Sequence, residues 1–483
     1  MYIRHSRYAV PGPHRTGIPT ALSALARSPL DGYVRLAAKY GDTVRIPFTA
    51  GRSFYLLSRP EHAEHVLAAN QDNYVKALTT FLPLRALIGD GLLTSDGDRW
   101  RRHRRLVQPL FSRRHVAAFG PAMAAAAQRM VARWDLLAEG SVIDVPKQMS
   151  ALALDVLGQA LFGCDLTEDA EHMVKVMDGA QRVALLAPVL PLARGPASAR
   201  ALTAIARRVG GAANGIEGLV RRIVSAHGTA DLACPDPGGA GRTSSGDLLG
   251  VLQTAQANGG CALTGTEVSD EVATFLLAGH ETSATALSWS LALLSAHPAA
   301  RQRLEAELDA VLGDRDPGAG DVASLHWARA VVAEAMRLYP PAWTIERDAL
   351  GDDVVAGTPI PAGSLVVVPP YLVHRHPDFW PDPSGFDPGR FMPAQSADGD
   401  DGTRPRYAYI PFGGGRRACV GASFAELETV LVLATITRRY RLELTGRGVP
   451  APAGKITLRP GRELRMRLQR RLPGDVPEPG ARR

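Results

Sequence analysis

Cysteine is scarce in this sequence, and its four copies, Cys164, Cys234, Cys261 and Cys419, stand far apart. There is no CxxC pair and no Cys/His cluster, which argues against a zinc site. Four cysteines in 483 residues also exclude a disulfide scaffold. Cys419 is therefore a single thiol that its own neighbours must explain.

Long apolar runs are missing as well. The most apolar stretches, FLLAGHETSATALSWSLALL and ETVLVLATI, contain polar residues or fall short of the roughly 20 apolar residues that a membrane helix needs. The N-terminus carries no apolar segment of signal-peptide type, and no repeat period indicates a solenoid. We expect a cytoplasmic protein without a membrane span.

The composition is that of a globular protein, with 46% apolar and 21% charged residues. The net charge of +7 comes mostly from arginine, and the densest basic run is DRWRRHRRL at residues 98–106. One such run without interleaved aromatic residues is a weak indication of nucleic-acid binding. It suits an acidic protein partner or an anionic cofactor equally well.

The periodicity predicts a mainly α fold with small β-sheets. Short β-like pieces, TVRIPF and SFYLLS, come early, helical patterns dominate from about residue 100 to 340, and residues 350–373 alternate like strands. Residues 187–198 and 234–246 are predicted surface loops. Residues 471–483 resemble a disordered tail, which leaves 1–470 as a single domain.

The stretch PFGGGRRACVG at residues 411–421 suits a metal-binding thiolate. Its glycines permit tight turns and a close approach of the backbone to a flat ligand. The helix expected next, ASFAELETVLVLATI, places N-terminal amides near Cys419, which stabilises a thiolate. Arg417 can pair with a carboxylate. The alternative is a buried cysteine in a glycine-rich loop.

These residues resemble the F-x-x-G-x-R-x-C-x-G haem-binding loop of the cytochrome P450 superfamily. The matching positions are Phe412, Gly415, Arg417, Cys419 and Gly421. The resemblance implies the cytochrome P450 fold, a prism-shaped helical domain that encloses haem b. It also implies that Cys419 is the axial ligand of the haem iron, and it extends over about residues 33–468.

A second motif, AGHETS, lies in a long helix expected from about Thr266 to His297. A glycine inside a helix costs about 1 kcal/mol relative to alanine, so Gly279 needs a reason. The motif resembles the family's oxygen-activation segment, which implies that Ala278 and Gly279 contact the haem. It also implies that Glu281 and Thr282 are catalytic and organise proton delivery. A plain salt bridge at Glu281 and a close helix crossing at Gly279 are the alternatives.

A third motif, Glu334-Ala-Met-Arg337, places two opposite charges on one helical face among apolar residues. It resembles the family's E-x-x-R pair, and FDPGRF supplies Arg390 at the place of the arginine that completes the family's triad. The resemblance implies that Glu334, Arg337 and Arg390 form a structural lock beneath the haem.

The basic run and TIERDA resemble the family's propionate-binding positions. Trp100 and Arg104 match W-x-x-x-R, and Arg347 matches a further propionate-binding arginine. We expect His103 to be an exposed basic side chain. We expect the remaining arginines of the run to face the proximal surface and attract an acidic electron donor; these are Arg99, Arg101, Arg102 and Arg105.

The resemblance implies a haem-thiolate monooxygenase that inserts one oxygen atom from O2 into an apolar C–H bond, and we expect its substrate to be a terpenoid or similar specialised metabolite. The expected pocket draws on residues 180–195 and on an apolar set: Phe81, Leu82, Leu87, Leu92, Phe275, Ala342, Trp343, Ile345 and Ile456. Because too little sequence follows the haem loop for a reductase domain, we expect a monomer served by a separate ferredoxin and its NAD(P)H-dependent reductase.

Three alternatives differ in chemistry or class. A haem-thiolate enzyme can also desaturate, epoxidise or couple rings. A non-catalytic haem sensor or carrier needs no proton delivery, so the intact segment Gly279–Thr282 argues against it. A basic helical protein that binds nucleic acid would bind no haem, and its affinity would fall steeply with salt.

Overall fold

The computed structural model describes residues 10–47, 52–169, 172–175, 212–226, 247–257, 263–392 and 404–471. Its α-helices are α1 (Ile18–Arg27), α2 (Pro29–Tyr40), α3 (Pro60–Glu64), α4 (Leu78–Ile88), α5 (Gly97–Val107), α6 (Arg113–Asp135), α7 (Val145–Leu157), α10 (Ala212–Ala226), α11 (Leu248–Ala257), α12 (Gly265–Ala296), α13 (Pro298–Leu312), α14 (His326–Leu338), α15 (Pro370–Val373) and α16 (Ala422–Arg439). The prediction of a mainly α fold with small sheets is confirmed.

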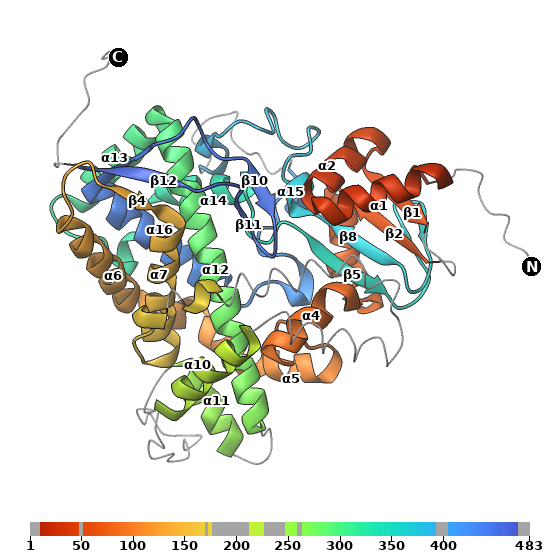
Figure 1. The fold of residues 1–483 in the computed structure, drawn as a ribbon, viewed down its shortest axis with the longest axis horizontal. Helices are drawn as coiled ribbons and strands as arrows, with labels where there is room; N and C mark the ends of the chain where they lie inside the picture. The colour runs from red at the N-terminus through yellow and green to blue at the C-terminus, as the bar shows by residue number, and fades with distance from the viewer. Residues whose placement is uncertain are drawn as a thin grey trace, which may run out of the picture.

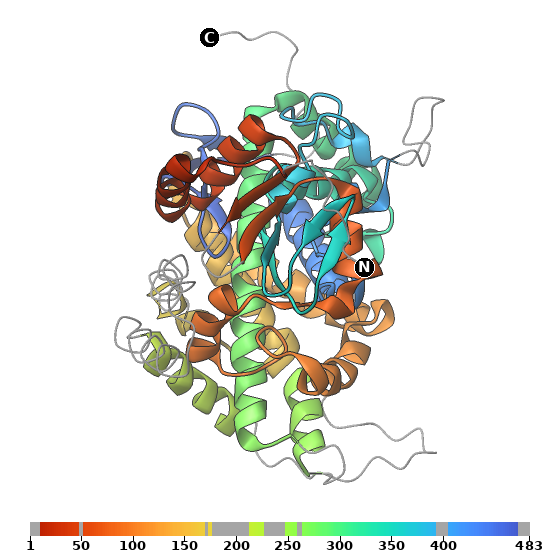
Figure 2. The same cartoon turned by 90° about the vertical axis from the view of Figure 1, so that its right-hand side faces the viewer.

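The helix α12 runs through the whole molecule and packs against α7, α14 and α16 (Figures 1 and 2). It begins with a capping box, in which Thr264 and Glu267 satisfy each other's backbone amides. It ends at Ala296, and Pro298 starts α13, because proline lacks the amide that would continue the helix. The predicted helix of about 266–297 is therefore confirmed within one residue at each end.

The strands form small separate sheets. The largest sheet has the order β1-β2-β8-β5-β3, in which only β2 and β8 are parallel. Its strands are β1 (Thr43–Pro47), β2 (Ser53–Leu57), β3 (Tyr74–Lys76), β5 (Ile345–Ala349) and β8 (Leu365–Val368). The remaining strands are β4 (Val142–Asp144), β6 (Asp353–Val355), β7 (Thr358–Ile360), β9 (Tyr440–Leu444), β10 (Pro452–Gly454), β11 (Leu458–Pro460) and β12 (Arg465–Arg470).

The large sheet and the helices α1 and α2 lie on one side of α12, and α6, α7 and α16 lie on the other (Figure 1). The core is continuous across the helical side, and a smaller cluster fills the space between the sheet and α2. At the junction, the buried Trp289 of α12 donates its indole N–H to the carbonyl of Leu458, 2.7 Å away. As a result, α12 and the large sheet lie on two sides of the candidate site.

Several predictions lie outside the described residues. These are the loops at 187–198 and 234–246 and the tail beyond residue 471. Within the described ranges, no helix combines the length and the apolar character that crossing a bilayer requires.

Candidate functional site

A large cavity of about 1840 Å³ lies between α12, α5, the cysteine loop and the sheet. Cys419 lines it, as do Thr282 of α12 and Trp100 of α5. On the far side it reaches α1 and α2, where Leu22 and Tyr33 line it. The structure thus brings the cysteine loop and the α12 motif, which are about 140 residues apart, to one enclosed space.

The cysteine loop ends in the turn that places Cys419 just before α16. The Cys419 amide donates to the carbonyl of Phe412, 2.8 Å away, which closes the loop. Gly415 has a φ of +63°, and a Cβ there would lie 1.8 Å from the carbonyl oxygen of Leu67. Gly415 does not line the cavity. The absence of a side chain at Gly415 allows the loop to pack against the π-helical turn His65–Ala69, and its contact with a ligand stays a prediction.

The Cys419 sulfur is open to the cavity but surrounded by protein. Burial raises the pKa of this thiol, although a hydrogen bond from the Gly421 amide and the charge of Arg104 act to lower it. The expected stabilisation by helix amides is therefore too small on its own to favour a thiolate. A metal cation at the sulfur would supply the missing positive charge.

Cationic side chains gather beside the cysteine loop. Arg104 donates to the carbonyl of Ala418 at 2.8 Å. Arg417 pairs with Asp96, and its guanidinium lies 4.3 Å from the centre of the Trp100 ring. These three expected propionate-binding residues, Trp100, Arg104 and Arg417, all line the cavity, where they could meet an anionic ligand.

Arg347 is the cation in this group that most clearly needs a further partner. It is buried, lines the cavity, and donates only to a backbone carbonyl, that of Glu346 at 2.9 Å. Burial and the nearby charge of Arg417 lower its pKa to about 10. Among the described residues it forms no ion pair. A buried guanidinium without a carboxylate fits a site for an anionic cofactor, so the residues present suit haem.

Lys76 is a cavity-lining cation that the sequence motifs did not reveal. Its ammonium donates to the carbonyl of Leu92 at 2.9 Å and to that of Leu93. Burial, followed by the charge of Arg417, lowers its pKa well below the usual value. No local pattern distinguishes this lysine, since its partners come from a loop 16 and 17 residues later.

The α12 motif presents Thr282 to the cavity, together with Ala278 and Gly279. The Thr282 hydroxyl donates to the carbonyl of Ala278, 2.7 Å away, a type of hydrogen bond that can bend a helix. A Cβ on Gly279 would lie 2.9 Å from a methyl carbon of Leu157. Because Gly279 has no side chain, α7 can pack closely against α12, and space is also left toward the cavity.

Glu281 is tied to a distant arginine. Arg459 contacts both carboxylate oxygens, with a 2.6 Å distance from one of its terminal nitrogens to Oε2, and the Thr457 hydroxyl donates to Oε1 at 2.7 Å. Burial alone would raise the pKa of Glu281, but these partners lower it below its usual value. The salt-bridge alternative for Glu281 is thus realised in this arrangement, and a proton can pass through this group only if Arg459 moves.

The third motif forms a buried network. Arg337 donates to both oxygens of Glu334 at 2.6 and 2.7 Å, and neither side chain is exposed to solvent. Arg390 lies 3.4 Å from the same carboxylate. Arg337 also donates to the carbonyls of His374, Pro383 and Gly385. The structure therefore brings the three predicted residues of the lock together.

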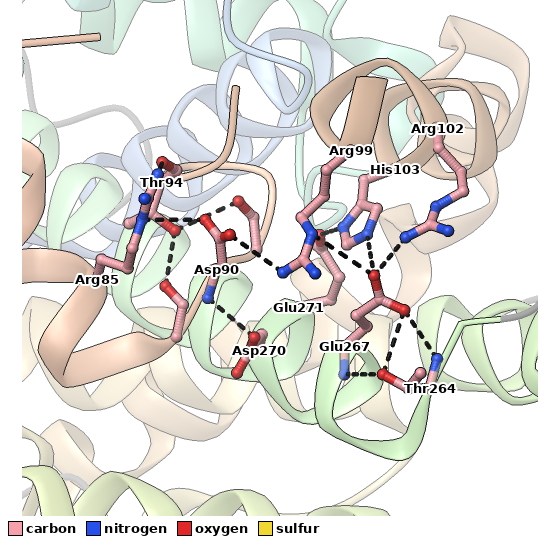
Figure 3. Close-up of polar contacts among 12 residues, drawn as sticks. Arg85, Asp90, Thr94, Arg99, Arg102, His103, Thr264, Glu267, Asp270 and Glu271 are labelled. Carbon is pink, nitrogen blue, oxygen red and sulfur yellow. Dashed lines mark hydrogen bonds and ion pairs between the residues drawn. The ribbon is translucent and has the colours of Figure 1, made fainter. Parts of the chain in front are cut away.

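The basic run behaves differently from the prediction. His103 is fully buried, and its ring nitrogens contact Glu271 and, at 3.4 Å, Glu267 (Figure 3). The expectation of an exposed His103 was wrong, because α5 packs this face against α12.

Arg99 and Arg102 also turn toward Glu267, as Figure 3 shows. Arg101 and Arg105 remain exposed, and Arg101 pairs with its neighbour Asp98. Arg99 and Arg102 thus pair with α12, but 43% of the Arg99 side chain and 39% of the Arg102 side chain remain open to solvent.

Most of the expected pocket residues line the cavity. Those that do are Phe81, Leu92, Phe275, Ala342, Trp343, Ile345 and Ile456. Leu82 and Leu87 do not, and Leu87 packs instead against the helical core. Phe275 stacks on Phe111, with ring centres 5.4 Å apart. The expected contribution of residues 180–195 lies outside the described residues.

The chain matches the family model described as "Cytochrome P450" over residues 12–463. It is 35% identical to cyclooctatin synthase of Streptomyces melanosporofaciens over 479 residues, 97% of this chain and 96% of that protein. It is 31% identical to pentalenene oxygenase of Streptomyces avermitilis, covering 93% of this chain and 95% of that protein. It is also 35% identical to putative cytochrome P450 132 of Mycobacterium tuberculosis, covering 85% and 87%.

Proposed function

The chain belongs to the cytochrome P450 family and is a monooxygenase of that family, and on this premise we propose that it hydroxylates an unactivated C–H bond of a terpenoid. The observation that carries the proposal is the large cavity whose walls are mainly apolar and which reaches both the Cys419 sulfur and the Thr282 hydroxyl. Two relatives whose names refer to terpenoids, cyclooctatin synthase and pentalenene oxygenase, support the substrate class.

In this proposal the Cys419 sulfur would hold the iron of haem b, and Trp100, Arg104, Arg347 and Arg417 would hold its carboxylates. When bound, haem supplies the reductive activation of O2 and the transfer of one oxygen atom. The protein contributes an enclosed cavity that orients the substrate and limits the access of water. Phe275 and Phe111 form one apolar wall of that cavity.

Thr282 is the residue of α12 that holds a proton at the cavity. Its hydroxyl now donates to Ala278, and a rotation about χ1 can turn it toward the cavity that it lines. Glu281, one residue earlier, is a carboxylate that can pass a proton onward once Arg459 releases it. We therefore assign the direct role to Thr282 and the supporting role to Glu281.

Replacing Thr282 with alanine is expected to divert electrons from product to peroxide or water, because the proton donor at the cavity is lost. We expect the product formed per NAD(P)H consumed to fall roughly fivefold or more. Thr282→Ser should keep most of the coupling. Thr285→Ala is the matched control, since Thr285 is buried in the same helix but does not line the cavity. Unchanged coupling in Thr282→Ala would refute the role of Thr282.

Replacing Arg347 with glutamine is expected to weaken haem retention, because it removes a buried charge that has only a carbonyl partner of its own. The loss of one charge-assisted hydrogen bond weakens binding roughly tenfold or more. We therefore expect the rate of haem transfer to apomyoglobin to rise by about the same factor. Arg471→Gln is the control, since Arg471 is buried and paired with Asp309 away from the cavity. Equal transfer rates for Arg347→Gln and the wild type would argue against propionate binding.

Electrons come, in our proposal, from a separate ferredoxin and its NAD(P)H-dependent reductase. Arg101 and Arg105 of α5 and Arg416 beside the cysteine loop are exposed cations that suit an acidic donor, and such a donor would compete with Asp98 for Arg101 and with Asp72 for Arg416. The rate of reduction should therefore fall as salt rises.

A screen for substrate-induced changes in the haem spin state, using purified terpenes and terpenoid alcohols, tests the proposed function directly. The mass of the product then distinguishes the outcomes. A gain of one oxygen atom supports hydroxylation or epoxidation, and product structure separates these two. A loss of two hydrogens would favour desaturation or ring coupling. A protein with a normal haem spectrum that binds no member of the terpenoid panel would overturn the substrate class.

A further inference from the structure

A polar cluster interrupts the apolar lining of the cavity. It consists of Tyr33 of α2, Thr80 of α4, and Thr344 and Glu346 at the start of β5, and all four residues line the cavity. The Thr80 hydroxyl donates to the Glu346 carboxylate. The Tyr33 hydroxyl lies beside the same carboxylate, and burial together with this charge raises the pKa of Tyr33 well above its usual value.

The direction of β5 separates this cluster from the cysteine loop. Successive side chains of a strand point to opposite faces of the sheet. The Ile345 side chain points toward the cysteine loop, where its terminal carbon lies 3.8 Å from the Cβ position of Gly413. Glu346 therefore points the other way, toward α2 and α4, as its contact with Thr80 confirms. The cluster therefore lies on the face of β5 that is turned away from the cysteine loop.

Glu346 is only partly satisfied by the protein. A carboxylate has about four acceptor sites, and Thr80 and Tyr33 provide two donors. Among the described residues Glu346 takes part in no ion pair, in contrast to Glu281, which has Arg459. Burial raises its pKa, and the nearby Asp348 acts in the same direction. Placing such a group in an apolar cavity is costly unless a further donor arrives.

Thr344 adds a second open hydrogen-bonding position. Its hydroxyl is buried and makes no well-formed hydrogen bond within the described part of the chain. The Thr344 hydroxyl lies near the Tyr33 phenol and acts to lower the pKa of Tyr33. A ligand group that reached this corner would thus meet one acceptor, Glu346, and one hydroxyl that can donate or accept.

The chemistry of the cluster selects among polar groups. A ligand carboxylate would be repelled by Glu346. A ligand ammonium would need the ionised form of Glu346, which burial disfavours, and would share the cavity with the cations Lys76 and Arg347. An alcohol avoids both penalties, because its hydroxyl donates to Glu346 and accepts from Thr344.

We propose that Glu346, with Tyr33, Thr80 and Thr344, binds a hydroxyl group already present on an apolar substrate. This inference rests on the proposed function and names its substrate more closely: a terpenoid alcohol, held by its hydroxyl at the end remote from the carbon that is oxidised. The reaction that supplies such a substrate is one that leaves a hydroxyl group, either a cyclisation that ends with the addition of water or an earlier hydroxylation.

The test compares alcohols with matched hydrocarbons. Farnesol and farnesene, phytol and phytene, and cedrol and cedrene are titrated into the holoenzyme, and binding is followed by spin-state change and by equilibrium dialysis. We expect wild type to bind at least one alcohol roughly tenfold or more tightly than its hydrocarbon partner, the scale of a hydrogen bond that satisfies a buried polar group. Glu346→Met should reduce this preference to within about threefold and leave hydrocarbon binding unchanged.

Three further variants sharpen the result. Glu346→Gln, which keeps an acceptor, should retain part of the preference, and Thr344→Val should lower it even if Glu346→Met fails to fold. Thr274→Val is the control, because Thr274 has a buried, unpaired hydroxyl in the α12 wall of the same cavity and should not affect the preference.

The proposal is overturned if wild type prefers no alcohol of the panel, or if Glu346→Met and Thr344→Val keep the full preference. A protein with a normal haem spectrum that binds neither alcohols nor hydrocarbons would instead overturn the proposed substrate class, and this inference with it.

Discussion

Replacing Cys419 with alanine is expected to abolish the thiolate-type ferrous–CO spectrum and to lower monooxygenase turnover roughly a thousandfold or more, to background. Cys419 is the only cysteine of the described residues that lines the cavity. Its sulfur lies near Arg104 and the Gly421 amide, just before the start of α16, and no second thiol of the described residues lines the cavity that could replace it. The measurement is the ferrous–CO difference spectrum of the purified variant, followed by product formation with a ferredoxin and its reductase.

The matched control is Cys164→Ala. Cys164 is half-buried beside α7, away from the cavity, and burial raises its pKa to about 11, which makes it an inert thiol. This variant should keep the wild-type spectrum and activity. If Cys419→Ala retained the thiolate-type spectrum, the ligand assignment would be wrong, and every role assigned around the cysteine loop would lose its basis.

The parts of the site that were predictable from sequence are those in which the chemistry lies within a few consecutive residues. Cys419 and Arg417 share one loop, Ala278 and Thr282 share one helical turn and its hydrogen bond, and the spacing of Glu334 and Arg337 places them on one face. The long helix α12 was predictable for the same reason, since its start and its end carry local signals.

The rest depends on contacts between distant segments. His103 was expected at the surface because its neighbours in sequence are arginines, but its environment is set by Glu267 and Glu271, more than 160 residues later. Glu346 follows an apolar residue in a strand, and only the fold brings Thr80 to it. Arg459 shows no motif, yet it determines the state of Glu281. Propensity and periodicity carry no information about such pairs.

The fold shows the same division. The strands β1 and β2 were recognisable as short β-like pieces of sequence, and they pair in antiparallel fashion. The parallel pairing of β2 with β8, which joins residues 54–56 to residues 365–367, was not predictable from either segment alone. This pairing matters for function, because β5 pairs with β8, and β5 contains both Arg347 and Glu346.

Replacing Glu334 with glutamine is expected to destabilise the protein by about 3–5 kcal/mol, the cost of leaving a buried charge without its partner. Arg337 would keep three carbonyl acceptors but lose its only carboxylate partner among the described residues. The Asp387 amide, which donates to Glu334 at 2.9 Å, and Arg390 would also lose an anionic partner. The measurement is the urea midpoint of unfolding, followed together with haem release.

Glu217→Gln is the matched control, because Glu217 pairs with Arg221 on the exposed face of α10, where 70% and 75% of the two side chains are open to solvent. Such a pair is worth about 0.5 kcal/mol or less, so its loss should hardly move the midpoint. If Glu334→Gln does not accumulate as folded protein, Arg390→Gln provides a milder test. That substitution removes only one of the two cations at the Glu334 carboxylate. If Arg390→Gln and Glu334→Gln had the same urea midpoint as Glu217→Gln, the network would not be a structural lock. The buried ion pairs would then contribute no more to stability than an exposed pair does.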